Sequence, residues 1–357
     1  MKKILFSAIA MMVAMVANAQ VTETQSATLT LEDGTTTVYY QSDALNKAYN
    51  AAPNSGATIV LSSGTFSIPQ WRKAINLYGV GFEDDATTST KRTYITGGIE
   101  LLPQDLKNMD NLHFEGICFN GNFTFSNNAN NSGAPITGVV IARCQFNTLS
   151  ANTNVKDLTI RQCRINGNVN GNANFKGDNV RVFNCWIANR VIDFPMNETR
   201  MSTVLVDHCI TNNWYASSNY GWASPQGPYR YTNCIIRQNV AAGGQMENCL
   251  MMAYKDTEVF PDNVVTNCQW GNGLAVSSFF KDEINNLDYS ETRTYELIDT
   301  YKTAGNDGTE IGLQGGYGWN KVSSVPRITE ISIDKQTSTE GILKVNLKAE
   351  AQPVVVD

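Results

Sequence analysis

The sequence predicts an all-β protein built as a parallel β-helix, a solenoid in which short strands stack coil upon coil. The main observation is a recurring local phrase: an apolar residue, two further residues, a cysteine, one more residue and usually a second apolar residue. Its cysteines are separated by 19, 22, 24, 25, 15 and 19 residues and are Cys144, Cys163, Cys185, Cys209, Cys234, Cys249 and Cys268. A period of about 20–50 residues is typical of solenoids, whose units bury apolar faces against their neighbours.

The cysteine phrase fits a bend between two strands of each coil. The apolar residue ends one strand facing inward, two residues form the bend, and the cysteine begins the next strand facing inward. The residue before the cysteine is asparagine in four coils, at Asn184, Asn233, Asn248 and Asn267. Asparagine tolerates the left-handed backbone of a tight bend and can form hydrogen bonds along a stack. We therefore predict a buried structural ladder of cysteines beside a partial asparagine ladder.

The redox state of the cysteines has three alternatives. Eight cysteines in an exported chain would normally indicate disulfides, but that rule concerns short chains that lack a core. Metal binding has less support, because the chain has no C-x-x-C pair and only His208 lies nearby, so we predict no metal. Buried free thiols fit the repeated position. Cys118 differs, because Ile117 and Phe119 take the inward positions, so we expect Cys118 to face outward or lie in a bend.

Segments at both ends of the repeat are expected to close the solenoid. Residues 42–52 predict a short helix that Ser42 caps and Pro53 ends, and residues 56–61 predict a buried strand. After Trp270 the phrase stops, and residues 277–302 predict a loop or helix across the last coil. Two alternating runs near the end of the chain predict a β-hairpin that covers the end or serves for attachment.

The first 19 residues have the form of a secretory signal. Lys2 and Lys3 precede an apolar run from Ile4 to Ala17, and small residues precede the expected cleavage after Ala19. We therefore expect a secreted, periplasmic or outer-surface protein without a transmembrane segment. The predicted organisation is a signal peptide at 1–19, an N-terminal strand and capping helix at 20–55, a β-helix at 56–320 and a C-terminal β extension at 321–357.

Net charge argues against one class of partner. The chain has 27 basic and 33 acidic residues, a balance of −6, and no basic cluster. Nucleic-acid binding is therefore not expected, because it depends on positive charge gathered along the phosphate backbone.

The N-terminal part of the repeat resembles right-handed parallel β-helix proteins of the pectate-lyase-like superfamily, of an uncharacterised bacterial type. In that family a short helix covers the first coil and leads into a strand and a Gly-Thr-aromatic turn, here Gly64-Thr65-Phe66. Residues 307–316 are similar to the closing segment of many secreted β-helix proteins. The resemblance covers residues 40 to 320 or so. It implies a right-handed solenoid with three strands per coil and says little about activity.

The resemblance also indicates what a catalytic member would need. A lyase requires carboxylates that hold Ca²⁺ against a uronate and an arginine or lysine base. Asp207-His208 matches part of the Trp-Ile-Asp-His phrase of pectate lyases, but it lacks the tryptophan, and we interpret it as a bend variant. A polygalacturonase is not expected, because neither His113 nor His208 lies near an aspartate pair.

The best available lyase group faces the side where the family places its clefts. Its members are Asp193, Arg237, Lys255, Asp256 and Glu258. The carboxylates would hold Ca²⁺, and Arg237 or Lys255 would act as the base. Scattered surface ion pairs would explain the same residues without chemistry.

The interval between Cys209 and Cys234 is rich in aromatic residues among asparagine, serine, glycine and proline. They are Trp214, Tyr215, Tyr220, Trp222 and Tyr229. Aromatic faces stack on sugar rings, and neighbouring amides bind hydroxyl groups. Such a loop can equally fold on itself and bury its rings.

We expect a non-catalytic secreted β-helix protein that binds a polysaccharide or cell-surface glycan through this loop, without a cofactor. The alternative is a polysaccharide lyase that acts on a uronate-containing polymer with Ca²⁺. A purely structural or adhesive surface protein is a third class, and it predicts no binding to soluble glycans.

Overall fold

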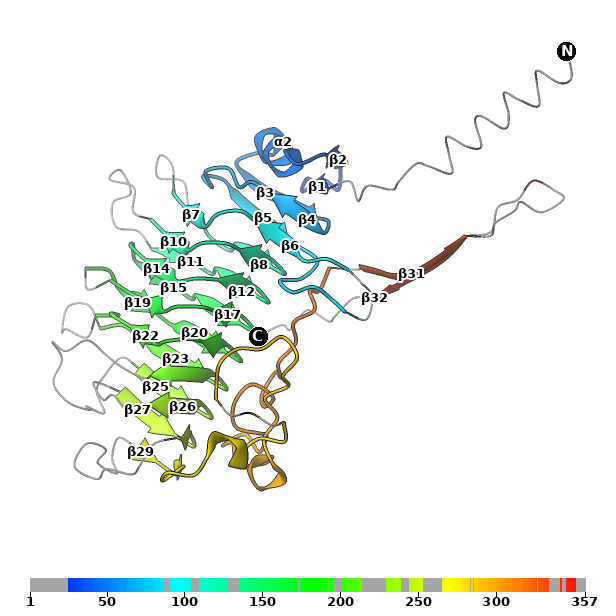
Figure 1. Cartoon of the computed structure of the whole chain (residues 1–357). Helices are drawn as coiled ribbons and strands as arrows, with labels where there is room; N and C mark the ends of the chain where they lie inside the picture. Colours follow the sequence, from blue (N-terminus) through cyan, green and yellow to red (C-terminus); the bar gives the residue numbers. More distant parts are fainter. Residues whose placement is uncertain are drawn as a thin grey trace, which may run out of the picture.

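The computed structural model describes residues 25–86, 90–103, 109–126, 135–172, 174–195, 201–213, 229–238, 244–252, 265–282, 284, 286–325, 327–333, 341 and 345–350. Within these residues the chain forms a tall stack of short strands with one helix at its N-terminal end (Figure 1). The predicted signal peptide, 1–19, lies outside the described residues. No helix in the described part has the length and apolar character needed to cross a membrane.

The largest sheet runs the full height of the stack. Its strand order is β2 (Thr36–Tyr40), β1 (Ser26–Thr30), β3 (Ser55–Leu61), β5 (Ala74–Tyr78), β8 (His113–Glu115), β12 (Val140–Ala142), β16 (Thr159–Arg161), β20 (Val180–Phe183), β23 (Val204–Asp207), β25 (Tyr229–Thr232), β27 (Gly244–Glu247) and β29 (Val265–Thr266). From β3 onward each strand pairs in parallel with its equivalent in the next coil. This repeated parallel pairing defines the solenoid.

A ten-stranded sheet forms the second face. Its order is β30 (Gln269–Trp270), β28 (Leu250–Met251), β26 (Ile235–Gln238), β24 (Ile210–Asn213), β21 (Trp186–Ile187), β17 (Arg164–Ile165), β13 (Gln145–Phe146), β9 (Cys118–Phe119), β6 (Thr93–Ile95) and β4 (Gly64–Phe66). It follows the twelve-stranded sheet around each coil, across the bend that carries the ladder cysteines.

Two smaller sheets complete the middle coils. The five-stranded sheet contains β22 (Val191–Ile192), β18 (Val169–Asn170), β14 (Leu149–Ala151), β10 (Phe123–Phe125) and β7 (Ile99–Leu101). The three-stranded sheet contains β11 (Ile136–Thr137), β15 (Val155–Lys156) and β19 (Gly177–Asp178). The all-β parallel β-helix is therefore confirmed, but the middle coils carry a fourth short strand that the expected three-strand coil lacks.

The predicted N-terminal cap is helix α2 (Ala44–Ala51), which buries Ala44, Leu45, Ala48 and Tyr49. The prediction of Ser42 as its cap was wrong. Asp43 is the residue that precedes the first turn, and no side chain caps the helix. The Ala44 amide instead donates to the backbone carbonyl of Gln41 (3.0 Å), so the chain turn itself begins the helix.

The bend that precedes each ladder cysteine uses a left-handed backbone. The φ angles lie between 47° and 53° at Arg143, Gln162, Asn184, His208, Asn233, Asn248 and Asn267. This conformation costs most L-residues roughly 1–2 kcal/mol, and asparagine is among the few that adopt it readily. The asparagines therefore suit the bend, and the other side chains must gain compensating contacts there.

The ladder cysteines form one buried column of free thiols, with Cys268 partly exposed at its end. The backbone N–H of one cysteine donates to the sulfur of the next, as from Cys144 to Cys163 (3.4 Å) and from Cys185 to Cys209 (3.3 Å). Each thiol in turn approaches a carbonyl, such as that of Arg161 for Cys163 (3.2 Å). The sulfur thus supplies the acceptor that a buried N–H requires.

Cys118 lies outside this column. The strand register places it beside Tyr94 and Gln145, on the outer face of the ten-stranded sheet. Its side chain is nevertheless only 1% exposed, and this burial raises the pKa of its thiol.

A second apolar core covers the outer face of the ten-stranded sheet. Four outward residues follow ladder cysteines directly and contribute to this core: Trp186, Ile210, Ile235 and Leu250. They pack against residues of the C-terminal part, among them Phe279, Phe280, Leu287 and Leu297. The expectation that residues 277–302 cross the last coil was therefore wrong. They lie along the sheet, with two short 3₁₀ helices, η1 (Val276–Ser278) and η2 (Asp299–Tyr301).

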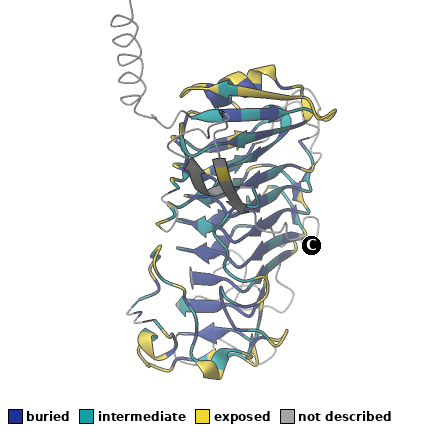
Figure 2. Ribbon diagram, turned by 90° about the vertical axis from the view of Figure 1, so that its right-hand side faces the viewer, coloured by how far each residue is buried: buried dark blue, intermediate teal, exposed yellow. Residues whose placement is uncertain are grey.

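The predicted C-terminal hairpin is formed by β31 (Arg327–Ile333) and β32 (Val345–Glu350), which pair antiparallel. Figure 1 shows the hairpin extending away from the coils. It therefore does not cover the end of the stack. Figure 2 shows the buried strands of the stack between more exposed turns.

Thiol counting tests the reduced column. After unfolding in denaturant without reductant, we expect all 8 cysteines to react, because the structure holds each as a free thiol. In the folded protein Cys268 should react first, since the other described cysteines are buried. Cys268→Ser should remove this fast phase, as measured by alkylation and mass spectrometry. A disulfide-linked pair among the ladder cysteines would contradict the arrangement.

Candidate functional site

The predicted lyase group is not assembled by the residues that the structure describes. Asp193 follows β22 of the five-stranded sheet, where burial raises the pKa of its carboxyl and Arg190 opposes that shift. Arg237 lies on β26 of the ten-stranded sheet and pairs with Asp288 (3.4 Å). The two residues therefore belong to different faces of the coil. Lys255, Asp256 and Glu258 lie outside the described residues.

Of the predicted sugar-binding aromatics, only Tyr229 is described. It begins β25, is 3% exposed and belongs to the main core. Its hydroxyl accepts a hydrogen bond from the Phe194 amide (2.9 Å). Tyr229 is therefore a core residue and offers no face to a sugar, which corrects the prediction for this position. Trp214, Tyr215, Tyr220 and Trp222 lie outside the described residues.

A C-terminal strap, residues 305–324, runs along the bend column and binds its side chains. The Asn233 side chain exchanges hydrogen bonds with Asn306 (2.8 and 2.9 Å). The Asn184 amide donates to the carbonyls of Leu313 (2.9 Å) and Gly315 (2.7 Å). Further along, Gln162 donates to the carbonyl of Gly318 (2.9 Å). Four of the seven bend residues thus contact the strap: Gln162, Asn184, His208 and Asn233. Along the column itself, Arg143 donates to Gln162 (3.0 Å).

Asp207 and His208 lie beneath this strap. The His208 Nε2 atom lies 3.2 Å from Asp307 Oδ2, and Asp207 accepts hydrogen bonds from Thr232 (2.6 Å) and Asn233 (2.9 Å). Burial acts to raise the pKa of Asp307, but the Thr309 amide and hydroxyl and the His208 ring lower it overall.

The His208 ring has no access for a substrate. It is 1% exposed, and the backbone of the strap lies directly against it. A Cβ atom added to Gly315 would come within 2.5 Å of the ring. The pair is therefore a structural link between bend and strap, in agreement with its interpretation as a bend variant.

A second buried polar cluster lies near the other end of the strap. Glu115 pairs with Arg143 (3.0 Å) and lies 3.0 Å from the His113 ring. The Ser324 amide of the strap donates to the same carboxylate (2.5 Å). Burial alone would raise the pKa of Glu115, but His113, Ser324 and Arg143 together bring it to about 2. This ion pair therefore fixes the strap to the bend, and it is sealed from solvent.

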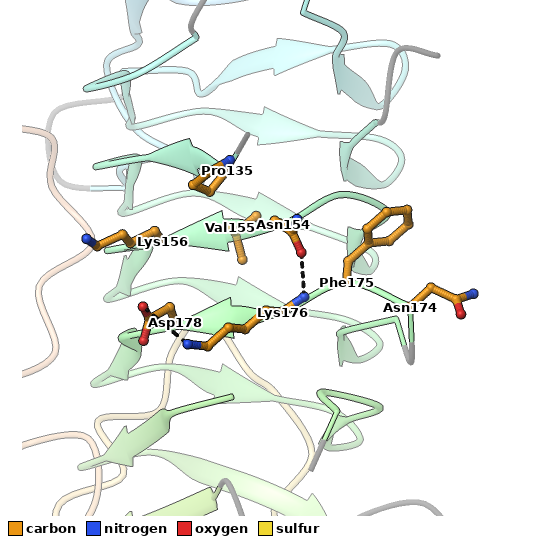
Figure 3. A pocket seen from close by; sticks show the side chains of 8 residues that line it. All are labelled: Pro135, Asn154, Val155, Lys156, Asn174, Phe175, Lys176 and Asp178. Carbon is orange, nitrogen blue, oxygen red and sulfur yellow. Dashed lines mark hydrogen bonds and ion pairs between the residues drawn. The ribbon is translucent and has the colours of Figure 1, made fainter. Parts of the chain in front are cut away.

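The candidate binding site is a groove of about 400 Å³ along the three-stranded sheet. We call it the coil groove, and it is lined by Pro135, Asn154, Val155, Lys156, Asn174, Phe175, Lys176 and Asp178. Figure 3 shows Phe175 and Asn174 at one end and Lys156 and Asp178 at the other. The groove thus combines an aromatic ring, two side-chain amides and two ammonium groups.

Neighbouring coils set the positions of these groups. Val155 pairs with Gly177 and Lys156 with Asp178, in register. The Lys176 amide donates to the Asn154 side-chain carbonyl (2.7 Å), and the Lys176 ammonium lies 3.6 Å from Asp178. These contacts hold the polar groups of two coils at a fixed separation. In parallel sheets that separation is about 4.8 Å.

Sequence reasoning did not identify the coil groove. The available signal was the density of asparagine between Cys144 and Cys185, outside the aromatic interval. The described residues contain no group of three or more histidine, cysteine, aspartate or glutamate side chains arranged to hold a metal ion.

Comparison with known proteins adds no assignment. No protein-family model matches the chain, and no curated protein and no solved structure shows significant similarity to it.

Replacing Glu115 with glutamine should destabilise the protein by about 3 kcal/mol at neutral pH, because the buried Arg143 guanidinium loses its counter-charge. The folded pKa of Glu115, about 2, is below the ordinary 4.5. Its contribution is therefore complete above pH 4.5 and is lost as the pH falls toward 2. In urea unfolding at several pH values, the free energy of unfolding of the variant should fall less steeply with decreasing pH than that of the unchanged protein.

The exposed Glu32 provides the control for this experiment. Glu32→Gln should leave both the stability and its pH dependence close to those of the unchanged protein. Equal acid sensitivity of the Glu115→Gln variant and the unchanged protein between pH 5 and 2 or so would refute the role of this pair.

Proposed function

We propose that this protein is a secreted, non-catalytic β-helix protein that binds a polysaccharide or cell-surface glycan. The observation that carries the proposal is the coil groove, with its aromatic ring, amides and ammonium groups on adjacent coils. Secretion is supported by the signal-like residues 1–19. Membership of the pectate-lyase-like superfamily is supported by the helix-capped solenoid and the Gly64-Thr65-Phe66 turn.

The chemistry of the groove suits a sugar chain. Sugar hydroxyls need both donors and acceptors, which Asn154 and Asn174 provide, and the C–H face of a sugar ring packs on an aromatic such as Phe175. Lys156 is exposed and forms no ion pair with a described carboxylate. It can therefore bind a hydroxyl or an acidic group. An extended ligand lying along the stack would meet the groups of neighbouring coils one after another.

The aromatic interval, between Cys209 and Cys234, belongs to this proposal because it occupies the same part of its coil as the groove strands do in theirs. It follows β24 of the ten-stranded sheet and precedes β25 of the twelve-stranded sheet. In earlier coils the same interval contains the strands of the five- and three-stranded sheets, including β15 and β19 of the groove. Trp214, Tyr215, Tyr220 and Trp222 are therefore candidate ligand contacts on the basis of sequence.

Phe175→Ala should weaken glycan binding roughly tenfold, because it removes a stacking face worth about 1.4 kcal/mol. Trp214→Ala and Trp222→Ala should weaken it as well if the aromatic interval takes part. Glycan arrays identify the ligand, and affinity gels measure the effect. Tyr317→Ala is the matched control, since Tyr317 is an exposed aromatic on the strap. Binding that none of the three variants reduces would rule out both surfaces.

The lyase alternative predicts a different outcome. Incubation of the protein with pectate, alginate or chondroitin and Ca²⁺ would then release unsaturated products with ultraviolet absorbance. We expect glycan retention without such products. Product formation that depends on Lys255 or Asp256 would replace the binding proposal with the lyase.

A further inference from the structure

One edge of the twelve-stranded sheet is open in the part of the chain that the structure describes. Strand β2 is the first strand in the sheet order, and β1 is its single partner among the described strands. Figure 1 shows it at the end of the stack, beside α2. Such an edge presents unpaired backbone N–H and C=O groups that another chain can bind.

Hydrogen bonds within the hairpin show which groups point outward. The Leu31 amide donates to the Thr35 carbonyl and the Gln41 amide donates to the Gln25 carbonyl, both at 2.9 Å. In antiparallel pairs, bonded positions alternate with non-bonded ones. Thr37 and Tyr39 therefore face β1 with their backbone groups. The N–H and C=O groups of Thr36, Val38 and Tyr40 point away from the sheet, toward its open edge.

The side chains at these positions do not block the edge. Val38 is 43% exposed and Tyr40 57% exposed, whereas Tyr39 packs partly against the core. Natural edge strands usually carry lysine, proline or a bulge that prevents pairing. The sequence of β2, Thr-Thr-Val-Tyr-Tyr, contains none of these and no charge. Asp43, which follows the strand, is already paired with Lys47 (2.8 Å).

We propose that β2 pairs antiparallel with β2 of a second copy of this chain, with the two-fold axis at Val38. Residues whose numbers sum to 76 then lie opposite each other, so Val38 faces its equivalent and Thr36 faces Tyr40. All three outward positions exchange backbone hydrogen bonds in this register. Their side chains share one face and form aromatic and β-branched cross-strand pairs, which stabilise antiparallel sheets.

A second copy is the occupant that the strand itself specifies. A two-fold interface requires a surface that is complementary to itself. An uncharged strand of 5 residues with Val38 at its centre meets this requirement in the antiparallel direction. The resulting dimer joins the twelve-stranded sheets of two solenoids end to end. It also presents two coil grooves, although the pairing does not depend on what those grooves bind.

The test is sedimentation velocity of the purified protein over a concentration series. We expect a concentration-dependent dimer, and Val38→Lys should raise its dissociation constant by about tenfold or more, because two lysines meet at the axis. Leu274→Lys places the same charge at another exposed apolar position, 62% exposed, and should leave dimerisation unchanged. Circular dichroism and thermal unfolding show whether the Val38 variant remains folded.

Cross-linking tests the register. Val38→Cys in a Cys268→Ser background should form a disulfide-linked dimer with oxidised glutathione, in which two thiols lose their protons and electrons as glutathione is reduced. Leu274→Cys in the same background should not cross-link to a comparable extent. A protein that stays monomeric throughout the series, or a dimer that Val38→Lys leaves intact, would overturn the proposal.

Discussion

The structure depends on the hydrogen bond between the N–H of one ladder cysteine and the sulfur of the next. At this bend a left-handed residue precedes the cysteine, and the amide that follows points at the thiol of the neighbouring coil. A buried amide without an acceptor costs about 1–3 kcal/mol. Alanine would leave the space of the sulfur unfilled and supply no acceptor, and a larger aliphatic residue would also lack an acceptor. Cysteine is small and apolar, and its sulfur can accept a hydrogen bond. These properties explain why cysteine recurs at this bend.

The left-handed bend has a second consequence, because it turns the side chain before each cysteine outward. The C-terminal strap binds several of these side chains and thereby ties the chain end to coils far away in sequence, from Asn233 to Glu115. Both clusters that contain a histidine and a carboxylate lie under this strap. The histidine and carboxylate groups that suggest acid–base chemistry in the sequence thus take part in contacts that hold the strap.

Local patterns explain which predictions succeeded. The β-helix, the cap helix and the terminal hairpin each have a short-range signal in period, turn residues or alternation. The second core has none, because residues 276–320 meet the outer face of the ten-stranded sheet only through long-range packing. The sequence did contain one sign of this second core. Four apolar residues occupy outward positions and need to be covered by other residues: Trp186, Ile210, Ile235 and Leu250. The prediction placed Asp193 and Arg237 on one side of the coils, but because the coils differ in length, the sequence does not show which sheet a residue belongs to.

Unequal coil length also shows where this solenoid can acquire function. The bend and its cysteine are constant, whereas the distance to the next cysteine varies from 15 to 25 residues. The variation falls after the ten-stranded sheet, in the interval that holds the strands of the five- and three-stranded sheets wherever the structure describes them. Changes there leave the column and the strap contacts intact. The coil groove and the aromatic interval both belong to this variable side, so a ligand surface can diverge there without disturbing the interactions that hold the coils together.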